Sequence, residues 1–321
     1  WVIRYMHTTG ASLFFAVVYL HMFRGLLYGS YQKPKELVWI FGCTIYLAMM
    51  AEGFLGYVLP YGQMSYWGAQ VIISLFGAIP YIGESLELWV RGDYYISGIT
   101  VSRFFALHVV ALPLVLIALV FLHLVALHEV GAGNPEGVDI EKYLDDDGVP
   151  LDSVPFFPYK VLNALVAIGV FMTVFSIIMF FFPEGGGYFI EMANFQEANP
   201  LVTPDHIAPV WYYAPFYTML RAIPDPLGGL IVMASAVAIF FIVPWLDRSK
   251  VASIRYKGIY SKIAITLFGV SFLTLGYLGT VGVTEIRKTM SIICTVIYFA
   301  YFLLMPIYSK YETTKKVPER L

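Results

Sequence analysis

Charged residues are scarce in this sequence. Asp, Glu, Lys and Arg make up only 13% of the 321 residues, whereas 59% are hydrophobic, and the mean hydropathy is +0.72. A soluble domain carries about 25% charged residues, which it needs to cover its surface. The composition therefore excludes an ordinary soluble domain and indicates an integral membrane protein.

Cysteine is also rare. The two cysteines, Cys43 and Cys294, both lie inside long apolar segments, which excludes a disulfide framework and a cysteine-ligated metal site. The net charge of −2 at pH 7 gives no reason to expect a nucleic-acid partner. The partner that the composition does indicate is the lipid membrane.

Seven apolar segments are long enough to cross a bilayer, which takes about 20 residues in a helix. None of them alternates as barrel strands do, so we expect an all-α transmembrane helix bundle. The predicted spans lie near residues 7–28, 36–58, 104–127, 161–182, 228–246, 263–283 and 289–308.

The Lys and Arg residues predict the orientation, because they are enriched in cytoplasmic loops. If the loop 29–35 is cytoplasmic, its side of the membrane holds 14 of the 20 basic residues, and the C-terminus is cytoplasmic as well. The sequence begins at Trp1, directly before a span and without a Met. We therefore expect an N-terminal piece to be missing.

Two connections on the opposite, outer side are too long for simple turns. Residues 59–103 contain SYWGAQVIISLFGAIPYIG, which suits a helix lying in the membrane interface. Residues 183–227 contain TPDHIAPVWYYAPFYTMLRAIPDP, whose Pro, Trp and Tyr residues indicate ordered structure at the headgroup level. Because loops this long are usually functional, we expect a site on the outer side.

Four of the six histidines form two pairs inside predicted spans: His7 with His21, and His108 with His123. At 1.5 Å and 100° per residue, the 14-residue step of the first pair spans roughly 21 Å and keeps both rings on one face. The 15-residue step of the second pair overshoots by about 60°. The second helix therefore needs a local irregularity, which Pro113 can supply by removing a backbone donor.

A histidine inside the membrane needs a polar partner. Each ring alone could be a hydrogen-bonded core residue or part of a proton path. Matched pairs on two helices instead favour haem, because opposing imidazoles can bind the iron of a flat macrocycle from both sides. Two such sites about 21 Å apart would lie near the two membrane faces.

Other residues fit the binding of a macrocycle. Gly42 and Gly56 repeat the 14-residue step on the next span, and small residues let a helix backbone approach closely. Arg4 and Arg103 near the outer helix ends, and Arg24 near an inner end, are expected partners for haem propionates. The alternative is that these arginines anchor the helices in the headgroup layer.

Five motifs together are highly specific. They are GYVLPYGQMSYWGA (56–69), AIPYIG (78–83), RFFALH (103–108), HEVGAGNP (128–135) and PVWYYAPFYTMLRAIP (209–224). With them the chain resembles, over essentially its whole length, the bacterial form of cytochrome b of the quinol:cytochrome c oxidoreductase, respiratory complex III. The resemblance implies helices B to H of an eight-helix family, with the first helix missing.

The resemblance also implies how the chain is divided and what it binds. Residues 1–160 would form the di-haem bundle with the first outer loop and an inner quinone-site loop, and residues 161–321 the C-terminal helices with the second outer loop. Two non-covalently bound b haems are implied: a low-potential haem between His7 and His108 near the outer face, and a high-potential haem between His21 and His123.

Quinol and quinone are the implied substrates, at two sites. Residues that match the outer, quinol-oxidising site are Phe54, Tyr57, Gly68, Pro209, Val210, Trp211, Tyr212 and Tyr217. At the inner, quinone-reducing site the match is His128, with Lys160 and Asn163 standing where the family usually has a Lys-Asp pair.

Val210 departs from the family pattern, which commonly has a proton-accepting Glu at this place. Valine cannot accept a proton. We expect Glu52, the carboxylate well inside a predicted span, to supply the base, because burying it in lipid is costly. The alternative is that Glu52 is paired within the bundle or faces a water-filled crevice.

In the family's reaction, one electron from quinol goes to a Rieske iron-sulfur protein and then to a c-type cytochrome. The other electron crosses the membrane to an inner quinone, which contributes to proton translocation. The resemblance implies these partners, a second copy of the chain, and the bacterial inner membrane. Two alternatives are a di-haem membrane anchor of a quinone-linked dehydrogenase, which would not need both outer loops, and a proton-coupled transporter, which would bind no haem.

Overall fold

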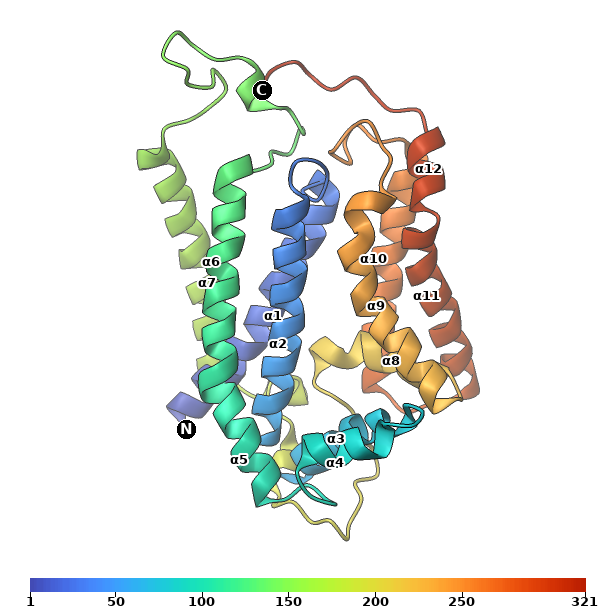
Figure 1. The fold of residues 1–321 in the computed structure, drawn as a ribbon. Coiled ribbons are helices and arrows are strands. Elements are labelled where there is room, and N and C mark those ends of the chain that lie inside the picture. Colours follow the sequence, from blue (N-terminus) through green and yellow to red (C-terminus); the bar gives the residue numbers. More distant parts are fainter.

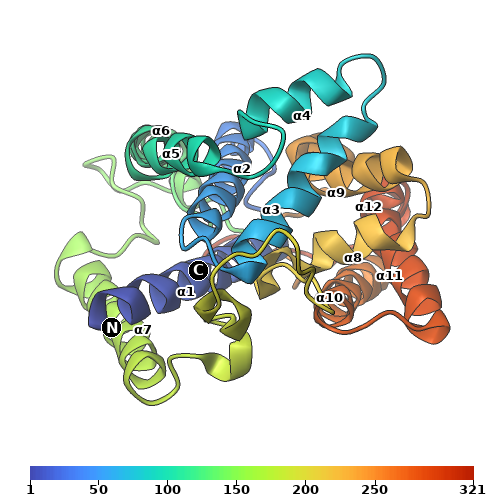
Figure 2. The ribbon, with the colours of Figure 1, turned by 90° about the horizontal axis from the view of Figure 1, so that it is seen from below.

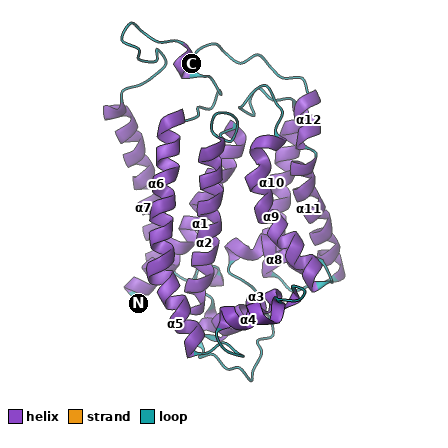
Figure 3. Ribbon diagram, viewed as in Figure 1, coloured by secondary structure: helices purple, strands orange, loops and turns teal.

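The computed structural model describes residues 1–321 and is almost entirely helical. Figure 3 shows helices and loops without a strand, and the only β pairing consists of two isolated bridges. Helices satisfy their own backbone polar groups, which is what a lipid environment requires. The predicted all-α class is confirmed.

Seven helices are long and apolar enough to span a membrane, as predicted. They are α1 (Val2–Tyr28), α2 (Glu36–Val58), the continuous segment Gly98–Val130, the segment Phe156–Phe181, α9 (Pro226–Leu246), α10 (Ile259–Thr280) and α11 (Glu285–Leu303). The third contains α5 (Gly98–Ala106), a π-helical turn (Leu107–Ala111) and α6 (Leu112–Val130). The fourth contains a short irregular turn (Phe156–Lys160), in which Phe157 is extended, and α7 (Val161–Phe181).

Shorter helices occupy the two long loops. The first loop contains α3 (Gln63–Ser74), a 3₁₀ turn (Leu75–Ala78) and α4 (Gly83–Arg91). The predicted interfacial helix is thus two helices, which are divided near Pro80. The second loop contains the turn Trp211–Tyr213 and α8 (Ala214–Ala222), and α12 (Met305–Tyr311) ends the helical part of the chain.

Both long loops lie at the same end of the bundle, the lower end in Figure 1, where α3, α4 and α8 gather. The C-terminus lies at the opposite end. We call the first end the outer end and the other the inner end, as in the predicted topology. The shared placement of the two loops agrees with the sequence prediction.

The helices form two groups, which Figure 2 shows side by side when viewed from the outer end. One group contains α1, α2, α5, α6 and α7; the other contains α8 to α12. Contacts between α2 and α9 join the groups, and α7 packs on α1. The structure places α7 beside α1, in the first group.

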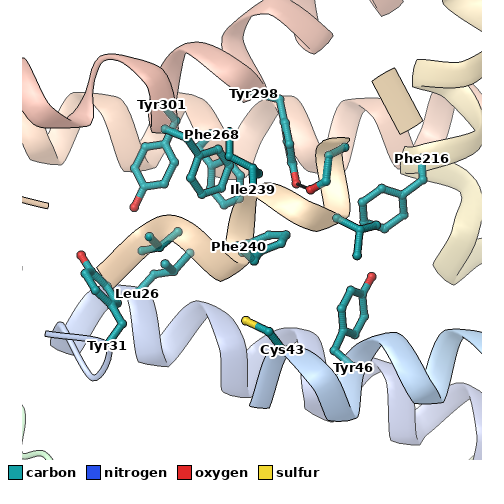
Figure 4. Close-up of a cluster of buried hydrophobic side chains, with 14 of the residues drawn as sticks. Leu26, Tyr31, Cys43, Tyr46, Phe216, Ile239, Phe240, Phe268, Tyr298 and Tyr301 are labelled. Carbon is teal, nitrogen blue, oxygen red and sulfur yellow. Dashed lines mark hydrogen bonds between the residues drawn. The ribbon is translucent and has the colours of Figure 1, made fainter. Parts of the chain in front are cut away.

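An aromatic core fills the contact between the two groups (Figure 4). Tyr46 on α2 is fully buried, as are Tyr298 and Phe302 on α11. The indole nitrogen of Trp39 donates to the carbonyl of Phe240 over 2.7 Å, and the Tyr298 hydroxyl group donates to the carbonyl of Ala236 over 2.7 Å. These bonds satisfy the polar ends of large aromatics, which otherwise could not be buried.

Candidate functional site

The four predicted histidines face each other in two pairs. The ring centroids of His7 and His108 lie 6.0 Å apart with an interplanar angle of 67°, and those of His21 and His123 lie 6.4 Å apart with an angle of 76°. His7 and His21 come from α1, and their partners come from the third span. The structure thus brings the rings together in the pairs that the resemblance implied.

A π-helical turn supplies the predicted irregularity in the third span. It covers Leu107–Ala111 and so contains His108, and Pro113 begins the following α-helix. A π turn accommodates one extra residue in a helix, so the 15-residue step from His108 to His123 acts as a 14-residue step. Both rings can then face α1.

Gly42 and Gly56 on α2 lie against the third span at the level of its two histidines. A Cβ atom placed on Gly56 would overlap the His108 ring, at 2.8 Å from Nδ1, and one placed on Gly42 would lie 3.3 Å from Cε1 of His123. These glycines allow α2 to approach the histidine rings themselves. The close approach that their spacing predicted is present.

A cavity of about 570 Å³ surrounds the outer histidine pair. We call it the histidine cavity. His7, His108, Gly53 and Gly56 line it, and Arg4 lies at its edge. Of the other predicted propionate partners, Arg103 is directed elsewhere, because its guanidinium donates to the carbonyl of Trp89 over 2.9 Å. Arg24 near the inner pair lies over the ring of Tyr28.

A second cavity, of about 540 Å³, lies between α2, α3, α9 and the second outer loop. We call it the loop cavity. Six of the predicted quinol-site residues line it: Phe54, Tyr57, Gly68, Pro209, Val210 and Tyr217. A Cβ atom on Gly68 would meet nothing within 4 Å, so this glycine borders open space. The lining is almost wholly apolar and contains no carboxylate.

Trp211 and Tyr212 do not line the loop cavity, although the resemblance implied that they would. They belong to a 3₁₀ turn, in which side chains three residues apart share a direction. Val210 and Tyr213 therefore both face the loop cavity, while Tyr212 lines the histidine cavity and Trp211 lines a third cavity of about 880 Å³ beside α1 and α10. Tyr212 stacks on Phe15 with ring centroids 3.9 Å apart.

Glu52 also lies outside the loop cavity. Its carboxylate Oε1 is 3.0 Å from Nδ1 of His108, and its backbone carbonyl oxygen is 2.9 Å from the same atom. Glu52 lines the histidine cavity. The structure thus gives no geometric support to Glu52 as the base for quinol, and agrees with the alternative that it is paired within the bundle.

The predicted inner-site residues are exposed and lie on different helices. His128 is in the last turn of α6, Lys160 directly precedes α7, and Asn163 lies in the first turn of α7. Helices α6 and α7 do not pack closely on each other. The structure places all three at the inner end but does not join them into one site.

Several residues near these sites were missed by sequence reasoning. Asn194 and Glu191 line the histidine cavity, and the Asn194 side-chain oxygen accepts from the backbone of Ser65 over 2.8 Å. Gln63 binds the second loop by donating to the carbonyl of Val202 and accepting from the backbone of Asn199. These contacts join loops more than a hundred residues apart in the sequence, so no local sequence pattern could have predicted them.

At the inner end, Lys35 was also missed. It precedes α2 and lies near Gly133 of the loop after α6. Burial lowers the pKa of Lys35, and the carboxylates of Asp139 and Glu141 partly offset this effect. Lys35 therefore places a half-buried amine beside the loop that follows α6, at the inner end.

Family models match two parts of the chain. The model described as Cytochrome b/b6/petB matches residues 1–131, which include all four paired histidines. The model described as Cytochrome b(C-terminal)/b6/petD matches residues 197–299, which include the turn 211–213 and α8. Both halves of the site geometry thus fall within matched segments.

Full-length similarity extends to named proteins. The chain is 56% identical to a cytochrome b of Allochromatium vinosum, over all of this chain and 79% of that protein. It is 45% identical to a cytochrome b of Rhodospirillum rubrum, over 99% and 76% of the two chains. A chain of a hyperthermophilic respiratory Complex III superposes with a TM-score of 0.89 at 36% identity, over 96% of this chain and 79% of that one. The chain therefore belongs to the cytochrome b family, the family of the cytochrome b subunit of quinol:cytochrome c oxidoreductase, respiratory complex III.

Proposed function

We propose that this chain, as the cytochrome b subunit of a quinol:cytochrome c oxidoreductase, binds two b haems through His7 with His108 and His21 with His123. The spacing of the rings supports this ligation. A metal–imidazole bond is about 2 Å long, so two such bonds and the two ring radii span roughly 6 Å. The observed centroid separations are 6.0 and 6.4 Å.

The surroundings of the rings fit a flat macrocycle as well. Gly53 and Gly56 line the outer site, and neither adds a side chain that would occupy the space of the macrocycle. Arg4 is the arginine placed to meet a propionate at the histidine cavity. When bound, the two haems would supply a one-electron path between the outer and inner ends.

Quinol would be oxidised in the loop cavity. Its apolar lining excludes water and suits a quinone ring and the start of an isoprenoid tail. Gly68 leaves room for the ring, and Tyr57 and Val210 separate it from the histidine cavity. The lining therefore orients quinol beside Tyr57 and Val210, the two side chains that an electron would pass on its way from quinol to the outer haem.

Tyr57 is the lining hydroxyl group best placed to carry a proton away. The hydroxyl groups of Tyr213 and Tyr217 donate to the carbonyls of Met50 and Ile207. Tyr57 instead reaches the histidine cavity, where Asn194 and Glu191 face it. A proton leaving quinol would pass along Tyr57 toward Glu191, in place of a carboxylate at position 210.

Quinone would be reduced at the inner end, where His128 can hydrogen-bond a quinone carbonyl and Lys160 and Asn163 can contribute donors. The support is their shared placement at that end. The partners that the proposal includes are a Rieske iron-sulfur protein, a c-type cytochrome and a second copy of this chain.

The proposed location is the bacterial inner membrane, with the C-terminus in the cytoplasm. The inner end carries the predicted majority of basic residues, in the loops 29–35 and 247–258 and in the C-terminal tail. Cytoplasmic loops are enriched in Lys and Arg, so this end would face the cytoplasm.

A redox titration of the purified complex tests the proposal. We expect two b-type components in the reduced spectrum of the wild type. His7→Ala should remove one component and His21→Ala the other, because each substitution deletes one ligand of one pair. A reduced sample without b-type absorption, or both components surviving in both variants, would contradict the ligation.

A further inference from the structure

The contact between the Glu52 carboxylate and His108 has no counterpart at the inner histidine pair, where valine occupies position 38, the corresponding place on α2. Two oxygens of Glu52 lie within 3.0 Å of Nδ1 of His108. At the inner pair, the backbone of Val38 is the group near Nδ1 of His123, and no side-chain partner reaches this nitrogen. The two sites thus differ in whether a carboxylate lies beside the Nδ1 atom of the ligand from the third span.

The Glu52 carboxylate has no other partner. Its second oxygen, Oε2, is buried and unpaired, and no Lys or Arg lies within salt-bridge distance of either oxygen. The side chains of His108 and Glu52 are only 15% and 20% exposed. A carboxylate withdrawn from water in this way acts on its neighbour more strongly than a solvated one.

We propose that Glu52 is a positioning residue for His108 and lowers the reduction potential of the outer haem relative to the inner haem. The backbone carbonyl of Glu52 accepts from Nδ1–H of His108, which fixes the tautomer that leaves Nε2 free for iron. The carboxylate, 3.0 Å from the same nitrogen, holds a negative charge against the ring and limits its orientation. A carboxylate in this place also raises the basicity of the imidazole, which favours ferric over ferrous iron. This inference rests on the haem ligation proposed above.

A lower reduction potential at the outer haem would set the direction of electron transfer between the two haems. If Glu52 stabilises the oxidised outer haem and nothing equivalent acts on His123, an electron arriving at the outer end moves to the inner end with a favourable change in free energy. One side chain of α2, the helix that lies in sequence between the two histidine helices, would then contribute to the asymmetry.

The test is a redox titration of the intact complex that carries Glu52→Gln, beside Glu52→Asp, which keeps the charge. In the Gln variant we expect the reduction equilibrium of one b component to shift toward the reduced form by about tenfold, which is about 59 mV for one electron. The other component should stay unchanged, and the Asp variant should titrate close to wild type. Glu191→Gln is the matched control, because Glu191 lines the same cavity but is not among the hydrogen-bond or ion-pair partners of His108.

The outcomes separate this inference from the proposed function. A wild type without two b components would contradict the ligation itself. Two wild-type components with no shift in Glu52→Gln, or an equal shift in Glu191→Gln, would overturn the role of Glu52 alone. If the Gln variant loses the outer haem while the Asp variant retains it, the carboxylate is required to hold His108, as proposed; loss in both variants would overturn the proposal.

Discussion

Tyr57 and Val210 are the two residues that line both the loop cavity and the histidine cavity. Tyr57 lies near the outer end of α2, and Val210 directly precedes the turn Trp211–Tyr213. A single layer of side chains therefore separates the proposed quinol site from the proposed outer haem. Substitutions on one side of this layer should disturb one site and spare the other.

A substitution at Gly68 tests the proposed quinol site. It borders open space in the loop cavity, so Gly68→Val would fill volume that quinol needs. Overpacking typically costs about 1–3 kcal/mol, which predicts a fall in quinol oxidation of about five- to 150-fold. The measurement is quinol:cytochrome c turnover beside the b-haem spectrum, which should not change.

Gly98→Val is the matched control for Gly68→Val, because a side chain at Gly98 also meets nothing within 4 Å but lies outside both cavities. Its turnover should stay near that of the wild type. Equal losses in the two variants would mean that the cavity volume at Gly68 is not what quinol uses.

Substitutions at Gly56 and Gly42 test the proposed haem sites. A methyl group at Gly56 would overlap the His108 ring, whereas one at Gly42 would lie 3.3 Å from the His123 ring and needs a shift of only a few tenths of an ångström. We expect Gly56→Ala to displace His108 and to lose one b-type component from the spectrum, and Gly42→Ala to retain both components. Haem content per complex decides between them, and a normal content in Gly56→Ala would contradict the observed close approach.

Much of this arrangement could be predicted from the sequence where the signal is periodic. The 14-residue steps of His7 with His21 and of Gly42 with Gly56 follow directly from helix geometry, and the 15-residue step of the second pair required an irregularity, which the structure has at His108. These predictions depend only on residues within one helix or on two facing helices.

Side-chain directions in the outer loops could not be predicted in the same way. Trp211 and Tyr212 share a motif with Pro209 and Val210, but a 3₁₀ turn directs the four residues to three different cavities. The direction of Glu52 likewise depends on where its helix meets the π turn at His108. Both features are set by tertiary packing, which a motif does not specify.

The π-helical turn at His108 can be tested by deleting one residue from it. Val110 lies within this turn and is 56% exposed, so deleting it should convert the turn to α-helix and leave a 14-residue step from His108 to His123. We expect both b components to survive. Deleting Val17, which is 47% exposed on α1, would leave a 13-residue step from His7 to His21. This would rotate one ring away from its present direction by about 100°, the turn of one residue.

The visible spectra of the two deletion variants test whether the π turn aligns the histidine rings. The Val17 deletion should lose one b-type component and the Val110 deletion should lose none. If both variants lose a component alike, the π turn does not serve to align His108 with His123.

A buried ion pair stabilises the inner end. The carboxylate of Asp247 accepts from the ammonium of Lys257, from the hydroxyl group of Tyr31 over 2.7 Å and from the amide of Gln32 over 2.9 Å. The side chains of Asp247 and Lys257 are 0% and 6% exposed. Removing one partner of such a pair leaves a buried charge and costs about 3–5 kcal/mol, so Asp247→Asn should lower the thermal midpoint of the complex. Adding Lys257→Met should restore part of the loss, because it removes the unpaired charge.

The same pair should make stability depend on pH in the acid range. Burial raises the pKa of Asp247, but the charge of Lys257 and the hydrogen bonds from Lys257, Tyr31 and the Ser249 backbone outweigh this effect and hold it below the ordinary 3.8. A carboxyl group with a lowered pKa in the folded state contributes its full stability above its unfolded pKa and loses it as the pH falls through the folded pKa. Thermal midpoints of the wild type and of Asp247→Asn should therefore differ by a constant amount above about pH 5 and converge below pH 3.8. Curves that stay parallel down to the acid limit would mean that Lys257 does not hold Asp247 in its charged form.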